Sequence, residues 1–418
     1  MKRNAEIITF GCRLNIYESE ILKQGVKDNN IENTSIFNSC AVTSETVRQV
    51  KQSIRKRKRE FPGDKIIVTG CAAQTEPKTF SEMDEVDLVS GNIEKRNINN
   101  LISNEFSKNK INVGNIMDNK QELNGLTDGY DDRSRAFIEI QNGCNHRCTF
   151  CIIPYGRGNS SSKSVKDIIS EINLMLETGH KEIVLTGVDI ASWGHDLEKK
   201  SNLGFLISKI LIGCPNLKRL KLSSMDIIGF DDQLLDIVSS EKRVLPHLHL
   251  SLQAGDNMIL KRMKRRHLRE DAINLCSKIR GKRKDVAFGA DLITGFPTET
   301  NQMFLNTLKI VDECNLDWLH VFPFSPRPGT PAAKMPQNKR EVSKERARIL
   351  RNKGEEIKKL HLNNLVGKEV EVFVEKNNSG HTNQFAPVKL EDDFLPGSSV
   401  IAKIIKSDNN YVYGKSID

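Results

Sequence analysis

Long apolar runs are absent from this chain of 418 residues, although hydrophobic residues make up 38% of it. No stretch approaches the ~20 apolar residues that a membrane-spanning helix requires. The first residues, MKRNAEIITF, lack the apolar core of a signal peptide. We therefore expect a cytoplasmic protein without membrane contact, and we take it to be a monomer. Its length favours two or three domains.

The chain also lacks the even set of cysteines expected of a secreted, disulfide-linked protein. It has nine cysteines, an odd number, and disulfide frameworks are rare in cytoplasmic proteins. Metal ligation or catalysis is therefore the better interpretation for the cysteines that cluster. Cys214, Cys276 and Cys314 occur singly in apolar or helical segments, which is typical of small buried side chains.

Acidic residues are fewer than basic ones: the chain has 54 Asp and Glu and 63 Lys and Arg, which gives a net charge of +9. Such an excess favours a polyanionic partner, nucleic acid first, although a Lys- and Asn-rich composition alone gives a similar balance. The densest basic run lies in a helix pattern over residues 44–60. We predict that this run contacts RNA phosphates, the alternative being a solvated helix face. The predicted RNA-binding residues are Arg48, Lys51, Arg55, Lys56 and Lys58.

The chain is predicted to be an α/β protein of three parts and a linker. Residues 1–118 alternate strand patterns with helix patterns, which indicates an N-terminal parallel α/β domain. Residues 119–135 are polar and aperiodic, as expected of a linker. Residues 136–362 contain six strand–helix units that suit a partial (β/α)6 barrel, with an open doubly wound sheet as the alternative. Residues 363–418 predict a small antiparallel β-barrel, either for RNA binding or as a structural cap.

Three cysteines follow the first predicted strand of the central part and form what we call the central triad: Cys144, Cys148 and Cys151. This position is the carboxyl-terminal face of a barrel, where active sites of that architecture lie. Thiolates are the ligands that iron–sulfur clusters require. Structural zinc prefers four ligands in paired arms, and no second arm is nearby. His146 stands between two of the cysteines, which makes joint ligation awkward.

Three further cysteines, the N-terminal triad, are far apart in sequence: Cys12, Cys40 and Cys71. Each of them directly follows a predicted strand, in IITFGC, SIFNSC and IIVTGC. The carboxyl ends of parallel strands meet at one edge of a sheet, which is the usual ligand edge. We therefore predict that the N-terminal triad converges on a second three-thiolate site, the alternative being three unrelated buried cysteines.

The spacing C-x3-C-x2-C, with the aromatic Phe150 before the last cysteine, resembles the signature of the radical S-adenosylmethionine superfamily. The resemblance implies a [4Fe-4S] cluster on the central triad as catalytic centre. Its open iron would bind S-adenosylmethionine, whose cleavage yields a 5′-deoxyadenosyl radical. The resemblance assigns to the cofactor Phe150 of the cysteine loop and residues at the later strand ends, the alternative for the polar ones being ordinary strand-end hydrogen bonds. The strand-end residues are Gly187, Val188, Ser223, Gln253, Asp291, Thr294 and Gly295.

The order of parts resembles the methylthiotransferase family, with residues 380–385 (GHTNQF) similar to the core of its TRAM domain. The resemblance implies a second [4Fe-4S] cluster on the N-terminal triad and insertion of a methylthio group into an unactivated C–H bond. S-adenosylmethionine would serve as methyl donor and as radical source, and a flavodoxin or ferredoxin would supply electrons.

The family's branches differ beside the first cysteine. Arg13 and Leu14, with residues 186–194 (TGVDIASWG), resemble the branch that acts at C2 of N6-threonylcarbamoyladenosine at tRNA position 37, in the anticodon loop. The alternative is methylthiolation of a ribosomal protein side chain, because the sequence CNHRC at residues 144–148 also occurs in that branch. An arginine usual in the family after Gly158 is missing here, with Lys163 as the candidate substitute.

Overall fold

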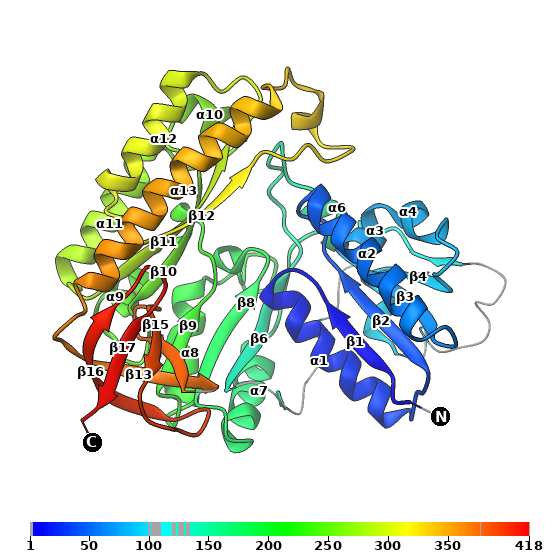
Figure 1. Ribbon diagram of the computed structural model, residues 1–418, viewed down its shortest axis with the longest axis horizontal. Coiled ribbons are helices and arrows are strands. Elements are labelled where there is room, and N and C mark those ends of the chain that lie inside the picture. Colours follow the sequence, from blue (N-terminus) through cyan, green and yellow to red (C-terminus); the bar gives the residue numbers. More distant parts are fainter. Residues whose placement is uncertain are drawn as a thin grey trace.

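The computed structural model describes residues 3–98, 101, 110–118, 123, 129–130, 134–376 and 378–417, so most of the predicted linker lies outside the described residues. Figure 1 shows an N-terminal α/β part beside a larger central part, with a small β-barrel at the far end from the N-terminus. This arrangement confirms the predicted α/β class and the order of its parts along the chain.

The N-terminal part contains a parallel sheet of five strands in sequential order, β1-β2-β3-β4-β5. The three predicted strands are confirmed, and two short strands extend the sheet. Helix α2 begins at its predicted residue because the side chain of Thr43 accepts a hydrogen bond from the backbone N–H of Thr46. The elements are β1 (Glu6–Thr9), α1 (Arg13–Asp28), β2 (Thr34–Ser39), α2 (Ser44–Glu60), β3 (Lys65–Gly70), α3 (Cys71–Thr75), α4 (Pro77–Ser81), β4 (Leu88–Ser90), η1 (Glu94–Arg96) and β5 (Ile111–Asn112).

The central part has six parallel strands, each beside the next one along the chain, as a partial barrel requires. Strands β6, β8 and β9 form one ladder and β10, β11 and β12 another. An isolated parallel bridge between Met225 and Leu250 joins the two ladders. A doubly wound sheet would reverse its strand order at a switch point, and no reversal occurs among the described strands. The two-residue strand β7 pairs antiparallel with the β6 edge.

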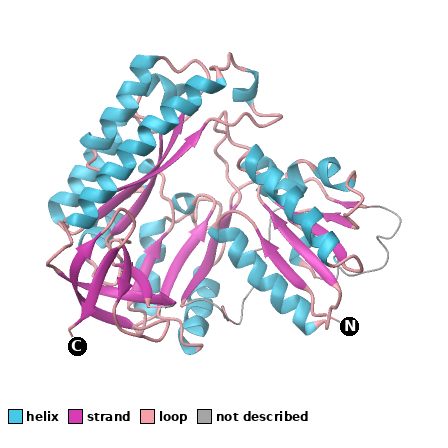
Figure 2. Ribbon diagram, viewed as in Figure 1, coloured by secondary structure: helices cyan, strands magenta, loops and turns pink. Residues whose placement is uncertain are grey.

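Helices cover the outer side of the curved central sheet (Figure 2). Strand β8 (EIVLTG) is a nearly continuous apolar run because it is buried on both faces, whereas β10 (HLHLSLQ) alternates apolar and polar residues. The elements are β6 (Arg135–Asn142), α6 (Ile153–Arg157), β7 (Ser161–Ser162), α7 (Val165–Glu177), β8 (Glu182–Gly187), η3 (Ile190–Ser192), α8 (Leu203–Gly213), β9 (Arg219–Leu222), η4 (Ile227–Gly229), α9 (Asp232–Ser240), β10 (His247–Gln253), α10 (Asn257–Arg262), α11 (Arg269–Lys282), β11 (Ala287–Thr294), α12 (Asn301–Glu313), β12 (Trp318–Pro323), η5 (Pro331–Lys334) and α13 (Arg340–Asn363).

The C-terminal part is a closed barrel in the order β13-β14-β15-β17-β16. Its pairings are antiparallel as predicted, except that β15 and β17 run parallel. The barrel packs on the amino ends of the central strands, where Arg135 and Arg219 form ion pairs with Glu375 and Glu371. It therefore lies at the end of the central barrel opposite the cysteines. Its strands are β13 (Glu369–Lys376), β14 (Ser379–Thr382), β15 (Pro387–Leu390), β16 (Ser399–Ser407) and β17 (Val412–Ser416).

Candidate functional site

The central triad lies in a loop at the carboxyl end of β6. The loop turns at Gly143, whose φ is +67°, and a Cβ there would lie 2.0 Å from the carbonyl oxygen of Asn159. The backbone N–H of Cys144 donates to Gly158 O at 3.0 Å, and that of Thr149 donates to Met263 O at 3.1 Å. The loop is thus held from two sides, with its three thiols half-buried.

Burial raises the pKa of Cys144 and of Cys151 to about 12. Each of these thiols also responds to the charge of Cys148, so the three lie close together. Metal binding at such thiols must release protons. Arg265, at 3.9 Å from Cys148 Sγ, brings positive charge to the triad and donates to Ser251 O at 2.8 Å. Arg265 was not named among the predicted site residues; it lies in a second stretch rich in Lys and Arg, residues 261–269, which follows β10.

The side chain of His146 contacts Asp189 and not the thiols of the central triad. Its Nε2 lies 2.7 Å from Asp189 Oδ2, and Ser192 also donates to that carboxylate. Ligand atoms of Cys144, His146 and Asp189 lie within 4.8 Å of one another. Because Asp189 already holds the imidazole, the three thiols are the donor set that fits an iron–sulfur cluster.

The N-terminal triad converges at the carboxyl edge of its sheet, as the topology predicts. Cys12, Cys40 and Cys71 follow β1, β2 and β3. Gly11 lies against Cys40, since a Cβ on Gly11 would lie 2.9 Å from Cys40 Sγ. Burial and then the neighbouring Cys71 and Cys12 raise the pKa of Cys40 to about 12, against a backbone hydrogen bond from Val42. Three mutually influencing thiols fit a second metal cluster.

The two triads lie on either side of α6. This helix directly follows Cys151, and its Gly156 packs against Cys71, with 3.4 Å from the ideal Cβ position to Cys71 Cβ. The last residue of α6, Arg157, is 2% exposed. It donates to Glu18 at 2.7 Å and to Asn15 at 2.5 Å, both on α1. Arg157 therefore ties the central part to the helix that begins after Cys12.

Glu18 is the anionic centre of this contact, held by Arg157 and by Lys95 at 2.7 Å. Burial alone would raise the pKa of Glu18, but these two cations outweigh it and hold the pKa well below the ordinary 4.5. A carboxyl with a lowered folded-state pKa contributes stability above its unfolded pKa and loses it as the pH falls.

We expect the stability difference between wild type and Glu18→Gln to be largest near neutral pH and to shrink below about pH 4.5. Urea denaturation at a series of pH values measures it. A difference that stays constant from pH 7 to pH 3 would contradict the charged state of Glu18. Glu345→Gln, at an exposed pair on α13, is the control and should change neither the stability nor its pH dependence.

A cavity of about 230 Å³ opens between the two parts, at the carboxyl ends of the central strands. Its lining includes Phe150 of the central triad loop and Val42 and Thr43 after Cys40. Two further predicted cofactor residues, Gln253 and Asp291, also line the cavity. Gln253 has a φ of +68°, an uncommon backbone for a side chain of its size and one that clusters at functional sites. The remaining lining residues are Ile293, Phe322, Pro323, Phe324 and Ser325.

The other predicted cofactor residues do not line this cavity. Ser223 directly follows β9, and its buried hydroxyl has no hydrogen-bond partner in the described structure, as an incomplete polar site would show. Thr294 donates to Ser343 O, and Gly295 N–H donates to Glu299, so both are engaged by the outer layer. The close approach of Gly187 to Gln141 O leaves no room for a Cβ, and Val188 packs against the core.

Lys163, the candidate substitute for the missing arginine, does not line the cavity. It is buried and pairs with Glu171 at 2.7 Å, and its Nζ also lies 3.4 Å from the Tyr17 hydroxyl. Lys163 therefore joins α7 to α1 and stabilises packing between the two parts.

The predicted RNA-binding residues all lie on α2, where most are exposed. Arg48 pairs with Glu45, Lys56 with Glu60, and Arg55 with Glu85, the last two at 3.8 Å. Lys58 donates to Asp64 O at 2.8 Å. Such long or exposed pairs are weak, so these cations can be released to phosphates.

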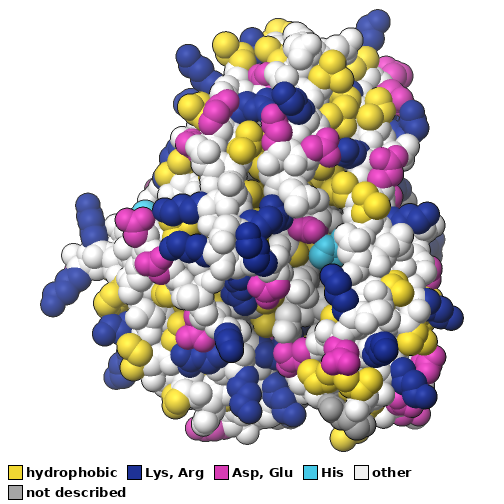
Figure 3. Space-filling view, turned by 90° about the vertical axis from the view of Figure 1, so that its left-hand side faces the viewer, with side chains coloured by type: hydrophobic (Ala, Val, Ile, Leu, Met, Phe, Trp, Pro, Cys, Tyr) yellow, Lys and Arg dark blue, Asp and Glu magenta, His cyan; other side chains and the backbone are white. Residues whose placement is uncertain are grey.

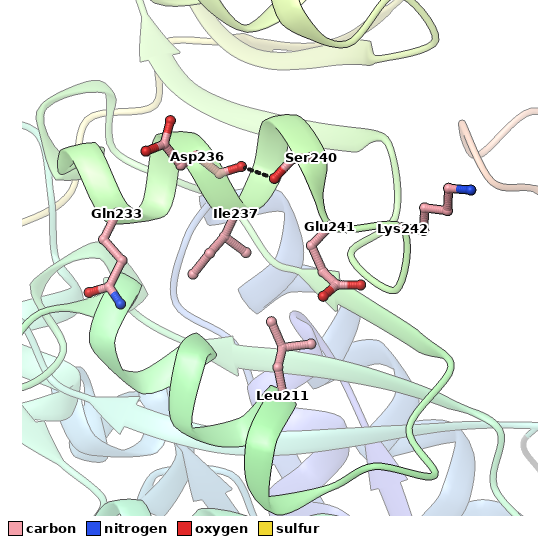
Figure 4. A pocket seen from close by; sticks show the side chains of 7 residues that line it. All are labelled: Leu211, Gln233, Asp236, Ile237, Ser240, Glu241 and Lys242. Carbon is pink, nitrogen blue, oxygen red and sulfur yellow. Dashed lines mark hydrogen bonds between the residues drawn. The ribbon is translucent and has the colours of Figure 1, made fainter.

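A larger hollow, of about 710 Å³, lies on the outside of the central part between α8 and α9 (Figure 4). Ser240 there donates to Asp236 O at 2.7 Å. None of the predicted site residues lines it. The face that carries α11 to α13 and the small barrel mixes Lys and Arg with Asp and Glu (Figure 3), without a field of one sign.

Within the described part of the chain, no helix is long and apolar enough to cross a membrane.

Family comparison matches residues 138–311 to the radical SAM superfamily and residues 4–91 to a family described as uncharacterized protein family UPF0004. The chain is 47% identical over 413 residues to threonylcarbamoyladenosine tRNA methylthiotransferase MtaB of Rickettsia prowazekii, covering 97% of this chain and 96% of that protein. It is 34% identical over 409 residues to MtaB of Aquifex aeolicus, covering 95% and 98%.

Among solved structures, the radical S-adenosylmethionine methyltransferase TsrM of Kitasatospora setae, with cobalamin and a [4Fe-4S] cluster bound, shares the fold. Its TM-score is 0.57 at 12% identity, covering 80% of this chain and 77% of that one. The chain therefore belongs to the radical S-adenosylmethionine tRNA methylthiotransferases, enzymes whose cofactors are S-adenosylmethionine and iron–sulfur clusters.

Proposed function

We propose that this enzyme inserts a methylthio group at C2 of N6-threonylcarbamoyladenosine at position 37 of tRNA. The observation that carries the proposal is one cavity with a three-cysteine site on each side. Phe150, between two cysteines of the central triad, lines the cavity together with Val42 and Thr43, which follow Cys40 of the N-terminal triad. The names of the relatives that match nearly the whole chain support the nucleoside.

Each triad would hold a [4Fe-4S] cluster through three thiolates. When bound at the central triad, the cluster and S-adenosylmethionine supply a 5′-deoxyadenosyl radical, and the second cluster supplies sulfur. Arg265 would stabilise the thiolates by its positive charge. Phe150 and Gln253 would position the cofactor at the cavity, with the unpartnered hydroxyl of Ser223 as a further contact. A flavodoxin or ferredoxin would deliver the electron.

The target adenine must leave the anticodon loop to reach the cavity. The segment after β12 closes the cavity from the side of the N-terminal part, since Ser325 contacts Ser44 and Arg327 pairs with Glu76. Phe322 and Phe324 line the cavity and offer faces on which a flipped base can stack. Helix α2 begins directly after Thr43, which lines the cavity. The phosphates beside the flipped base would therefore contact the basic residues of α2.

The α2 prediction is tested with the double variant Arg55→Gln/Lys56→Gln. We expect its affinity for tRNA to fall by roughly tenfold at physiological salt and the slope of log K against log salt to decrease by about two, one per lost phosphate contact. Filter binding at four salt concentrations measures both. Lys278→Gln on α11, a side chain with 55% exposure, is the control. Equal slopes for the double variant and wild type would remove α2 from the interface.

Reconstituted enzyme, S-adenosylmethionine and reductant test the proposed reaction with two substrates in parallel. One is tRNA carrying N6-threonylcarbamoyladenosine, and the other is a mixture of ribosomal proteins. We expect digested tRNA to contain the 2-methylthio nucleoside by mass spectrometry, and the proteins to gain no methylthio group. A methylthio group on a ribosomal protein and none on tRNA would reverse the assignment.

A further inference from the structure

Two neighbouring cations, one on β9 and one on α1, form no ion pair among the described residues. Lys221, on β9, is 2% exposed, and its Nζ lies 3.1 Å from the ring centroid of Phe385 of the small barrel. Neither the side chain of Lys221 nor that of Arg13, the half-buried first residue of α1, forms an ion pair or a hydrogen bond within the described structure. A buried cation is normally paired, so the unpaired Lys221, with the charge of Arg13 close by, indicates a site completed by an anion.

The two cations share one space. Burial and then the charge of Arg13 lower the pKa of Lys221 well below its usual range. His247, 4% exposed with an unpartnered Nδ1, faces the same charges, and burial followed by Lys221 lowers its pKa. Arg135 and Arg219, the next cations along, are already paired with glutamates. An arriving anion would relieve the repulsion between Arg13 and Lys221 and favour the charged form of Lys221.

This cationic pair lies beneath the cavity. Asp291 lines the cavity, and its Oδ1 lies 3.0 Å from His249 Nε2 and 3.3 Å from His320 Nδ1. The charge of Asp291 also reaches Arg13, but the carboxylate is engaged by the two histidines. Lys221 stands two residues before Ser223 at the end of its strand, which places it deeper in the barrel than the cavity mouth.

We propose that Arg13 and Lys221 bind the carboxylate of the threonylcarbamoyl group and so select the substrate. The inference rests on the proposed function. The threonyl carboxylate is the charge that separates this nucleoside from neutral N6-alkyl adenosines. Arginine offers a planar fork of donors that matches a carboxylate, and lysine adds a point charge. Phe385 holds the lysine amine by a cation–π contact, which gives the small barrel a part in forming the site.

The test compares two tRNA substrates that differ only in that group, the natural acid and its carboxamide. Wild-type enzyme should prefer the acid by roughly 100-fold in kcat/KM, because the amide leaves buried charges unpaired. In Lys221→Met and in Arg13→Gln this preference should drop to about tenfold or less, and Lys221→Arg should retain most of it. Lys209→Met, a surface lysine over Phe205, should keep the wild-type ratio.

The ratio of kcat/KM for the acid to kcat/KM for the carboxamide, taken within each variant, does not depend on the fraction of folded, cluster-loaded enzyme. An unchanged preference in both Lys221→Met and Arg13→Gln would overturn the inference. So would an increased KM for S-adenosylmethionine with no change of the ratio, since the bound anion would then be the cofactor carboxylate. Wild-type activity on neither tRNA would refute the proposed function itself, whereas equal wild-type activity on both would refute only the carboxylate site.

Discussion

Cys12→Ala enzyme is expected to bind about half of the wild-type iron, still to cleave S-adenosylmethionine, and to form no methylthio product. Two thiolates are too few to hold the N-terminal cluster. The central triad stands in a separate loop, tied to Gly158 and Met263 through backbone hydrogen bonds that do not involve Cys12. The measurements are iron per chain, 5′-deoxyadenosine by chromatography, and the modified nucleoside by mass spectrometry.

The complementary variant, Cys148→Ala, should lose both 5′-deoxyadenosine and product, because the radical source itself is removed. Cys214→Ala is the matched control, since Cys214 is buried and its thiol contacts Ile169 O at 3.9 Å, far along the chain from either triad. It should keep its iron and both activities. Full iron and full product in Cys12→Ala would show that the N-terminal triad holds no cluster.

Arg157→Met is expected to destabilise the protein by about 3–5 kcal/mol, because it leaves Glu18 buried beside Lys95 alone. The variant should also lose product formation, since Arg157 aligns the helix after Cys12 with the loop that holds the central triad. Chemical denaturation measures the stability, and the nucleoside assay measures the activity.

Arg348→Met provides the control for Arg157→Met, because Arg348 is an exposed arginine that pairs with Glu345 on the outside of α13. It should show no measurable change in either assay. A denaturation midpoint of Arg157→Met equal to that of wild type would mean that the contact between the two parts does not depend on this ion pair.

Local pattern was enough to predict strands β1, β2 and β3 and the cysteines that follow them. A strand, a glycine and a thiol recur at Cys12 and at Cys71, and parallel topology brings them to one edge. Helix α2 has its predicted bounds because Thr43 caps it. The apolar helix pattern of this segment runs from Tyr17 to Asp28, whereas α1 starts at Arg13. Local pattern does not predict the first turn, because it carries the polar Arg13 and Asn15 and shows no apolar period.

Contacts between distant segments were beyond the reach of local pattern. Arg157 and Glu18 are separated by 139 residues, and the sequence around each of them contains no motif that predicts their ion pair. Lys163 was a candidate substitute for the missing arginine because of its position in the sequence, but its side chain contacts Glu171 and Tyr17 instead. Strand β14 is not predictable from local pattern, because Ser379–Thr382 contains no apolar alternation. The parallel pairing of β15 and β17 follows from barrel closure.

We propose that this chain methylthiolates N6-threonylcarbamoyladenosine in tRNA through its two cysteine triads. Nucleoside mass spectrometry of tRNA from a strain lacking the gene tests it most directly. We predict that the 2-methylthio derivative disappears, that its unmodified precursor accumulates, and that the wild-type gene restores it while the Cys12→Ala and Cys148→Ala genes do not. A nucleoside profile that stays unchanged on deletion, or restoration by either cysteine variant, would contradict the account.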